Sequence, residues 1–237
     1  MRINKYLAEA LKISRRKADE YVKNRRVKVN GKTINGFIDV KETDVIEVDG
    51  EVLSLDKERL YFAFNKPPFV ISSTSDEENR KTVCDFFEGI DKKLICVGRL
   101  DYLSEGLLIV TNDGDFANML MHPRFKIKKT YLIKTARRLS EEELENLRRG
   151  ATLEDGFFKP LKVQRTNNDR WILISINTGR NRIIRRFLKR FDIKIEKLKR
   201  IAIGNIELGN LKKGSYRKLT QEELSSIRKL TNGQRLN

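Results

Sequence analysis

The amino-acid sequence predicts an α+β fold in two parts: a small N-terminal module of helices and hairpins, then a mixed, largely antiparallel sheet flanked by helices. Near the N-terminus, apolar residues recur at helical spacing, and two hairpin signals follow them. From residue 60 onward, strand patterns outnumber helical ones without the strict strand–helix–strand alternation of a parallel sheet. The charged stretch SLDKERL separates the two parts, so we expect domains at residues 1–58 and 59–237.

The N-terminal module is expected to begin with two short helices within residues 3–24. Ser14 has the residue type of an N-cap and precedes the second helix. The stretches RVKVNGKTI and DVIEVDGEVL alternate apolar and polar residues around Asn-Gly at 30–31 and Asp-Gly at 49–50. Such dipeptides are strong signals for tight turns, so two hairpins complete the module.

The larger domain contains strand patterns in LYFAFN, LLIVT, KKTYLIKT and WILISI. Between them, Asp113 is placed to cap one short helix, and Ser140 opens another with Glu143 completing a capping box. The segment NRIIRRFLKRF at 181–191 is amphipathic, with its apolar residues on one face and its basic residues on the other. These elements together predict the mixed sheet with flanking helices.

The charge of the chain points to a polyanionic partner, most simply nucleic acid, because the formal net charge is +17. Residues 1–32 carry eleven Lys or Arg against three acids, and residues 180–200 carry ten against two. Residues 33–58 carry two against eight. Few aromatic residues accompany the first cluster, so we expect it to dock on a structured nucleic acid rather than to stack on bases. Its candidate phosphate contacts are Arg15, Arg16, Lys17, Lys23, Arg25, Arg26 and Lys28.

Other features disfavour several classes of protein. No apolar run approaches the roughly 18 residues needed to span a bilayer, and the first residues lack the apolar core of a signal peptide. Cys84 and Cys96 lie outside CxxC spacing and His122 is the only histidine, which disfavours zinc sites and Cys–His catalysis. We expect a cytoplasmic protein that needs no metal and no cofactor.

Two sets of motifs resemble known families. RINKYLAEALKISRRKADEYVKNRRVKVNGKTI resembles the S4 RNA-binding domain in its SRR, its basic second helix and its hairpin. NKPPFVISS, VGRLDYLSEGLLIVTNDGDFANMLMHP, KKTYLI, GRNRIIRRFL and KLKRIAIGNIELGNLKKGSYRKLT resemble, in the family's order, the S4-bearing pseudouridine synthases that modify ribosomal RNA. ANMLMHP and RRGATLEDG are most similar to the branch that acts on 23S ribosomal RNA.

The resemblance implies an isomerisation in which the N1–C1′ bond of a uridine breaks and C5 joins C1′, without any cofactor. Such a reaction needs one carboxylate near the ribose and the base. Asp101 stands at the position of the family's catalytic Asp, and it remains open whether it attacks C1′, attacks C6 or removes a ribose proton. Tyr131 matches the tyrosine that stacks on the target uracil. Arg185 matches the basic residue that pairs with the Asp and would keep it ionised.

Further residues are expected to contact the RNA. Arg99 lies two residues before Asp101. When the uridine flips out of its stack, we expect Arg99 to bind the backbone phosphate or to fill the space that the base leaves, rather than to neutralise Asp101. Leu188 is expected to pack against the base or the ribose. The arginines around the amphipathic helix are expected to bind phosphates: Arg180, Arg182, Arg186 and Arg190.

The sequence departs from the family pattern at two positions. Ile183 stands where the family usually has Gln or Glu, and Phe69 stands where it usually has Gly, which implies a turn of different shape. A 16S uridine as target, and a non-catalytic RNA-binding assembly protein, are the alternative functions. The intact set of Asp101, Tyr131 and Arg185 argues against the second. We expect a monomer whose partner is structured ribosomal RNA, free or within an assembly intermediate.

Overall fold

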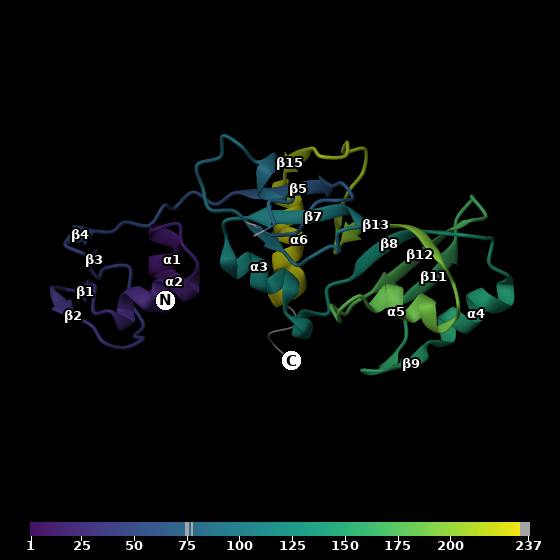
Figure 1. The fold of residues 1–237 in the computed structure, drawn as a ribbon, viewed down its shortest axis with the longest axis horizontal. Coiled ribbons are helices and arrows are strands. Elements are labelled where there is room, and N and C mark those ends of the chain that lie inside the picture. The colour runs from purple at the N-terminus through teal and green to yellow at the C-terminus, as the bar shows by residue number, and fades with distance from the viewer. Residues whose placement is uncertain (74–75, 77, 233–237) are drawn as a thin grey trace. The chain divides into compact units, whose positions relative to one another are not determined.

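The computed structural model describes residues 1–73, 76 and 78–232, and the chain divides into two compact units (Figure 1). One unit consists of Met1–Arg59 with the short segment Ile90–Lys93, and the other consists of Leu60–Gly89 with Leu94–Asn237. Within the described part of the chain, no helix has both the length and the apolar composition needed to cross a membrane.

The first unit packs two helices against a four-stranded sheet of order β2-β1-β3-β4. The Ser14 hydroxyl accepts a hydrogen bond from the Lys17 amide at 3.1 Å, which caps the second helix as expected. Asn30 and Asp49 have φ of 51° and 53°, the left-handed values that two-residue hairpin turns require. The elements are α1 (Ile3–Ala10), α2 (Arg15–Lys23), β1 (Val27–Val29), β2 (Lys32–Thr33), β3 (Ile46–Val48) and β4 (Glu51–Val52).

The second unit is built on a nine-stranded sheet of order β11-β12-β8-β13-β7-β5-β15, to which β14 and β6 are joined at β13 and β7. All the ladders between its named strands are antiparallel except the one between β7 and β13, so the predicted mixed, largely antiparallel sheet is confirmed. The strands are β5 (Tyr61–Lys66), β6 (Ile95–Val97), β7 (Glu105–Thr111), β8 (Lys129–Thr135), β11 (Lys162–Arg165), β12 (Trp171–Ile176), β13 (Ile195–Ile203), β14 (Ile206–Glu207) and β15 (Tyr216–Lys218).

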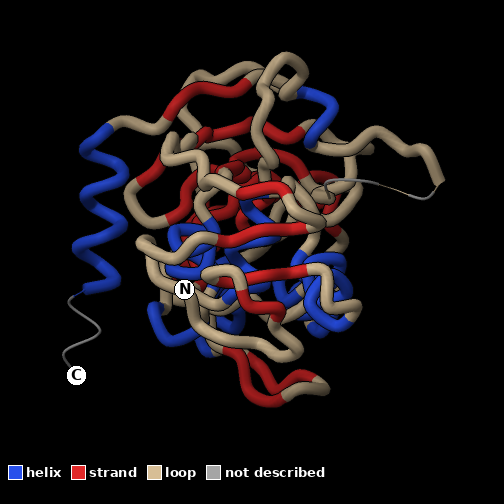
Figure 2. Tube along the Cα trace, turned by 90° about the vertical axis from the view of Figure 1, so that its left-hand side faces the viewer, coloured by secondary structure: helices blue, strands red, loops and turns tan. Residues whose placement is uncertain are grey.

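Helices and one small hairpin complete this unit. Phe116 of α3 and Ile227 of α6 belong to one apolar core with Leu107 and Ile109 of β7. The last helix, α6, runs along the outside of the strands before the C-terminus (Figure 2). The remaining elements are α3 (Gly114–Met121), α4 (Glu141–Arg149), α5 (Ile183–Arg190), α6 (Gln221–Asn232), two 3₁₀ turns (Cys84–Phe86, Pro123–Phe125) and the hairpin of β9 (Ala151–Leu153) and β10 (Gly156–Phe158).

The parallel contact between β7 and β13 depends on Gly106. This residue has φ of 104°, and a Cβ atom built on it would lie 2.3 Å from the carbonyl oxygen of Arg200. Only glycine allows so close an approach of two backbones. Arg200 is 3% exposed, and its Nε donates to the carbonyl oxygen of Leu107 at 2.7 Å. The loop that precedes β7 is thereby held beside β13 and its neighbour β8.

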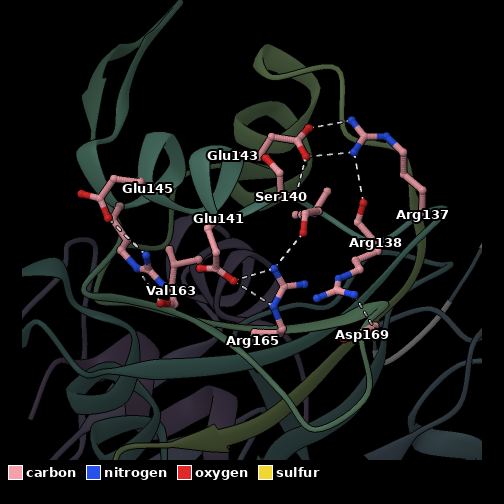
Figure 3. Close-up of polar contacts among 11 residues, drawn as sticks. Arg137, Arg138, Ser140, Glu141, Glu143, Glu145, Val163, Arg165 and Asp169 are labelled. Carbon is pink, nitrogen blue, oxygen red and sulfur yellow. Dashed lines mark hydrogen bonds and ion pairs between the residues drawn. The ribbon is translucent and has the colours of Figure 1, made fainter.

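Hydrogen bonds and ion pairs of charged side chains connect helix α4 to the edge strand β11 (Figure 3). The Ser140 hydroxyl accepts from the Glu143 amide at 3.1 Å, and the Glu143 carboxylate accepts from the Ser140 amide at 2.8 Å. This is the capping box that the sequence predicts. Arg165 of β11 donates to the carboxylate of Glu141 at 2.7 Å and to the carbonyl oxygen of Leu139 at 2.8 Å.

Candidate active site

A cavity of about 390 Å³ opens in the second unit where the loop before β7 meets β8, β13 and the start of α5. Its lining includes Asp101 from the loop, Tyr131 from β8, and Arg185 from α5. These three residues are far apart in the sequence, and the sheet order brings them together because β8 and β7 both pair with β13. The volume lies in the range of small-molecule sites.

The carboxylate of Asp101 contacts two guanidinium groups. Arg185 Nε donates to Asp101 Oδ2 at 3.2 Å, and Arg182 Nη1 lies 3.4 Å from the same oxygen. Arg182 immediately precedes α5 and has a left-handed φ of 45°. The sequence indicated the partner Arg185 but gave no sign that Arg182 also contacts Asp101, because that contact depends on this backbone turn.

Buried polar residues hold the loop that carries Asp101. Arg185 Nη2 donates to Ser104 Oγ at 3.0 Å, and the Ser104 amide donates to the carbonyl oxygen of Asp101 at 2.9 Å. Lys66, which has no exposed surface, donates through Nζ to the carbonyl oxygens of Ser104 and Pro67, each at 2.9 Å. Burial lowers the pKa of Lys66 to about 8, because the ammonium group is desolvated.

Sequence reasoning missed Lys66 and Ser104. A lysine that ends the largely apolar stretch LYFAFNK, directly before two prolines, was the available signal for the first. Such a lysine needs polar partners in the interior, and here they are the carbonyl oxygens at the end of β5 and in the loop.

The far wall of the cavity is formed by strand residues. Tyr131 is 8% exposed and is paired across the sheet with Arg200 on β13 and Ile174 on β12. Lys129 lies two residues earlier on β8 and also lines the cavity. Burial, with a smaller contribution from Arg200, lowers the pKa of Lys129 to about 8.

The cavity is strongly basic. Among the described residues that line it, Asp101 is the one carboxylate, and six side chains are cationic. An anionic ligand such as a nucleotide phosphate is therefore favoured, and the carboxylate lies within a positive surrounding. The cationic lining residues are Arg99, Lys129, Arg180, Arg182, Arg185 and Arg200.

Arg99 and Leu188 occupy different environments. Arg99 is exposed at the cavity, and no ion pair joins it to Asp101 in the part of the chain that the structure describes. Leu188 is fully buried and does not line the cavity, whose apolar wall at α5 consists of Ile183 and Ile184 instead. Ile183, at which the sequence departs from the family pattern, is thus part of the apolar wall of the cavity.

Arg180 and Arg186 both contact the turn of the β9–β10 hairpin. Arg180 Nη1 donates to Asp155 Oδ1 at 3.1 Å, and Arg186 Nη2 donates to Asp155 Oδ2 at 2.7 Å. The hydrogen bond from Arg186, followed by weaker attraction to Arg180, lowers the pKa of Asp155 to about 2. Sequence reasoning did not single out Asp155, although Asp155-Gly156 is a turn signal.

The basic residues expected to bind RNA in the first unit lie on α2, in the turn after it and, for Lys28, on strand β1. Arg26 stacks over the ring of Tyr21 at 4.2 Å and pairs with Asp49. The others are exposed, and the structure shows no ion pair for them within its described residues: Arg15, Arg16, Lys17, Lys23, Arg25 and Lys28. They present an unneutralised positive surface of this unit.

Both units are similar to known proteins. The family described as RNA pseudouridylate synthase matches residues 60–190, and the S4 domain matches residues 1–46. An RNA pseudouridine synthase of Aquifex aeolicus is 41% identical over 97% of this chain and 94% of its own. Ribosomal large subunit pseudouridine synthase B of Bacillus subtilis is 40% identical over 98% of this chain and 97% of its own.

Two further relatives extend these matches. The dual-specificity RNA pseudouridine synthase RluF of Escherichia coli is 33% identical over 97% of this chain and 79% of its own. A crystal structure of a pseudouridylate synthase superposes with a TM-score of 0.70 at 29% identity, over 96% of this chain and 99% of that one. The similarity therefore extends over both units.

Proposed function

The chain belongs to the S4-bearing RNA pseudouridine synthases, and from this premise we propose that it isomerises a uridine of 23S ribosomal RNA with Asp101 as the catalytic carboxylate. One observation carries the residue assignment. Asp101 is the one carboxylate among the described residues that line a basic cavity, and it lies there with the buried Tyr131 and two guanidinium groups.

The reaction breaks the N1–C1′ bond and forms a C5–C1′ bond, while C5 loses a proton and N1 gains one. A carboxylate at the ribose can act as nucleophile or as base in such a sequence. Arg185 holds the Asp101 carboxylate through Nε and the loop through Ser104, so the direction of the carboxylate is fixed. Prepositioning of this kind removes the cost of orienting the group during reaction.

Tyr131 and the apolar residues of α5 provide the surface for the uracil ring. The tyrosine is 8% exposed on a strand of the sheet, so its ring is held in place by packing. A uridine must leave its stack to reach Asp101, at a cost of a few kcal/mol. Contact with Tyr131 and with cationic side chains such as Arg99 offsets part of that cost.

Ribosomal RNA is the proposed partner because two relatives are named for RNA or ribosomal large subunit pseudouridine synthesis and because the basic residues of α2 are exposed. We place the S4 domain at residues 1–58 and the catalytic domain at 59–237, which the division of the structure after Arg59 supports. One chain contains Asp101, Tyr131 and Arg185 in a single cavity, so the site needs no residue of a second chain, and we propose a monomer that acts in the cytoplasm.

The decisive experiment maps pseudouridine in ribosomal RNA from cells with and without the gene. A 23S uridine should be unmodified without it, should be restored by the wild-type chain, and should stay unmodified with Asp101→Asn. The matched control is Asp155→Asn, which alters a carboxylate that also pairs with two arginines but does not line the cavity. This control should restore the modification.

The outcomes separate the parts of the proposal. A 16S uridine as the affected position would move the target to the small subunit. No change at any uridine would contradict the proposal, and full activity of Asp101→Asn would remove Asp101 from its role.

A further inference from the structure

Phe69 has an unfavourable backbone conformation with no benefit from burial. Its φ is 62°, in the left-handed region that glycine enters freely and that a bulky side chain enters only at a cost in strain. Its side chain is 60% exposed, so packing in the core does not compensate for the strain. Strained conformations that persist in this way are concentrated at functional sites.

The ring of Phe69 meets a second exposed ring. Tyr102 is 44% exposed, and the two rings lie edge to face with centroids 5.6 Å apart and an interplanar angle of 77°. The Phe69 amide donates to the carbonyl oxygen of Tyr102 at 2.7 Å, which ties the two backbones together. The next residue, Leu103, is 58% exposed and extends the apolar surface.

This aromatic pair adjoins the candidate catalytic group. Tyr102 follows Asp101 directly, so their Cα atoms are about 3.8 Å apart. Both residues belong to a turn that is closed by the hydrogen bond of 2.9 Å from the Ser104 amide to the carbonyl oxygen of Asp101. A uridine that flips out of its stack stays joined through the backbone to the nucleotides on either side. A uridine bound at Asp101 therefore brings its neighbours in the strand close to the two rings.

We propose that Phe69 and Tyr102 form a stacking platform for the nucleobase next to the target uridine, an inference that rests on the proposed function. A base that loses its stacked neighbour when the uridine flips out needs a new surface, and an exposed aromatic ring provides one. Every base has a face that can stack, so the platform stabilises the opened strand and does not select a sequence.

Charge favours RNA over a protein as the occupant. The exposed Arg99 and the half-exposed Arg182 flank Asp101, and both belong to the basic lining of the cavity. Proteins that hold single-stranded nucleic acid combine exposed aromatic rings with basic side chains. An apolar protein partner would leave these charges without anionic contacts.

The test compares Phe69→Leu with the wild-type chain. Leu keeps an apolar side chain at the strained position and removes only the ring. The substrate is a 23S ribosomal RNA transcript made with uridine tritiated at C5, from which pseudouridine formation releases tritium. We expect Phe69→Leu and Tyr102→Leu each to raise KM, and the Kd from filter binding, by at least about fivefold. The value of kcat should change less than twofold.

Two further variants act as controls. Phe69→Tyr retains the ring and should behave as the wild type. Phe157→Leu removes another phenylalanine that is 60% exposed in the same unit, and it should not change KM or Kd. If Phe69→Leu unfolds, Phe69→Gly replaces it, because glycine adopts the backbone angle without strain, and the same losses are expected.

The results distinguish the two proposals. Unchanged KM and Kd in Phe69→Leu, or an equal loss in Phe157→Leu, would overturn the platform while tritium release by the wild type supports the proposed function. A wild type that binds the transcript without releasing tritium would contradict the proposed function, and a weaker Kd for Phe69→Leu would then still support stacking. A wild type that neither binds nor reacts would overturn both.

Discussion

Arg185 connects Asp101 to the loop that carries it, since one guanidinium contacts both the carboxylate and Ser104. A lysine at this position supplies the positive charge but has a single point of attachment, so it cannot make both contacts in the same geometry. The side chain is 19% exposed, so water replaces these bonds only in part. Its two-point contact therefore determines the direction of the carboxylate as well as its electrostatic environment.

Replacement of Arg185 by Lys is expected to lower kcat about 100-fold, since misplacement of a reacting group by about 1 Å has that effect. The Kd for ribosomal RNA should change less than threefold. The control is Arg186→Lys, because the adjacent residue on α5 contacts Asp155 and not Asp101. Single-turnover tritium release measures the rates. Equal rates for the wild type and Arg185→Lys would contradict this expectation, because they would show that a positive charge at this position is enough for the reaction.

Lys66 makes stability depend on pH. Its pKa is lowered from 10.5 to about 8 in the folded protein, so between these values the unfolded chain binds more protons than the folded one. The contribution of Lys66 to the free energy of unfolding is therefore constant below about pH 7 and rises from about pH 8 to 10.5.

The comparison is with Lys66→Met, which has no titrating group. The free energy of unfolding of the wild type, minus that of the variant, should rise between pH 8 and 10 in urea titrations. A flat difference over this interval would show that the lysine is not desolvated as the structure indicates. Below pH 7 the difference should not change.

At the scale of residues, the sequence predicted which residues meet in the cavity better than the contacts that they make there. Asp101, Tyr131 and Arg185 were named from motifs, and the structure lines one cavity with all three. The positions of Lys66 and Leu188 could not be obtained in this way. The partners of Lys66 and the side of α5 that faces the cavity are set only when the sheet and the helix assemble, and a motif does not specify that.

At the scale of elements, local sequence signals correctly predicted the features that short-range hydrogen bonds form. Ser14, Asp113 and Ser140 cap their helices, because an N-cap bond closes within three residues of the chain. The same logic could have found Thr220, which precedes α6, and Glu223 in its first turn, which exchange the two bonds of a capping box. The parallel pairing of β7 with β13 has no local signal, since the strands are far apart in sequence.

The cap of α4 gives a prediction for stability. Ser140→Ala removes the hydroxyl that accepts from the Glu143 amide and should lower the free energy of unfolding by about 1 kcal/mol in urea titrations. The control is Ser225→Ala in the interior of α6, where an exposed serine makes way for a better helix former and no loss is expected. A loss at Ser225 equal to that at Ser140 would contradict the role of the cap.

At the scale of the whole molecule, the uneven charge determines how RNA is bound. Residues 1–32, which include the exposed arginines and lysines of α2, carry the positive charge of the first unit, whereas residues 33–58 of the same unit are net acidic. Each phosphate that a basic side chain neutralises releases condensed counterions, so affinity falls as salt rises. The composition predicted this behaviour, but the structure was needed to show that Arg26 is already paired with Asp49.

The salt dependence tests the basic surface of α2. Replacing Arg15, Arg16 and Lys17 together by Ala should weaken RNA binding at every sequence and flatten the plot of log K against log salt by up to about three units of slope. The matched control replaces Lys41 and Lys57, two exposed lysines of the acidic segment, and should leave the slope unchanged. An unaltered slope in the triple variant would place the phosphate contacts elsewhere.

The glycine-dependent contact between β7 and β13 also sets an order of events during synthesis. The first unit needs only the first 93 residues, whereas the strand behind Asp101 finds its parallel partner at residues 199–200. Domains fold as they emerge from the ribosome, N-terminal parts first. We therefore expect a nascent chain to fold its S4 domain before the loop of Asp101 is anchored, so that an unfinished polypeptide bound to RNA lacks the proposed active site.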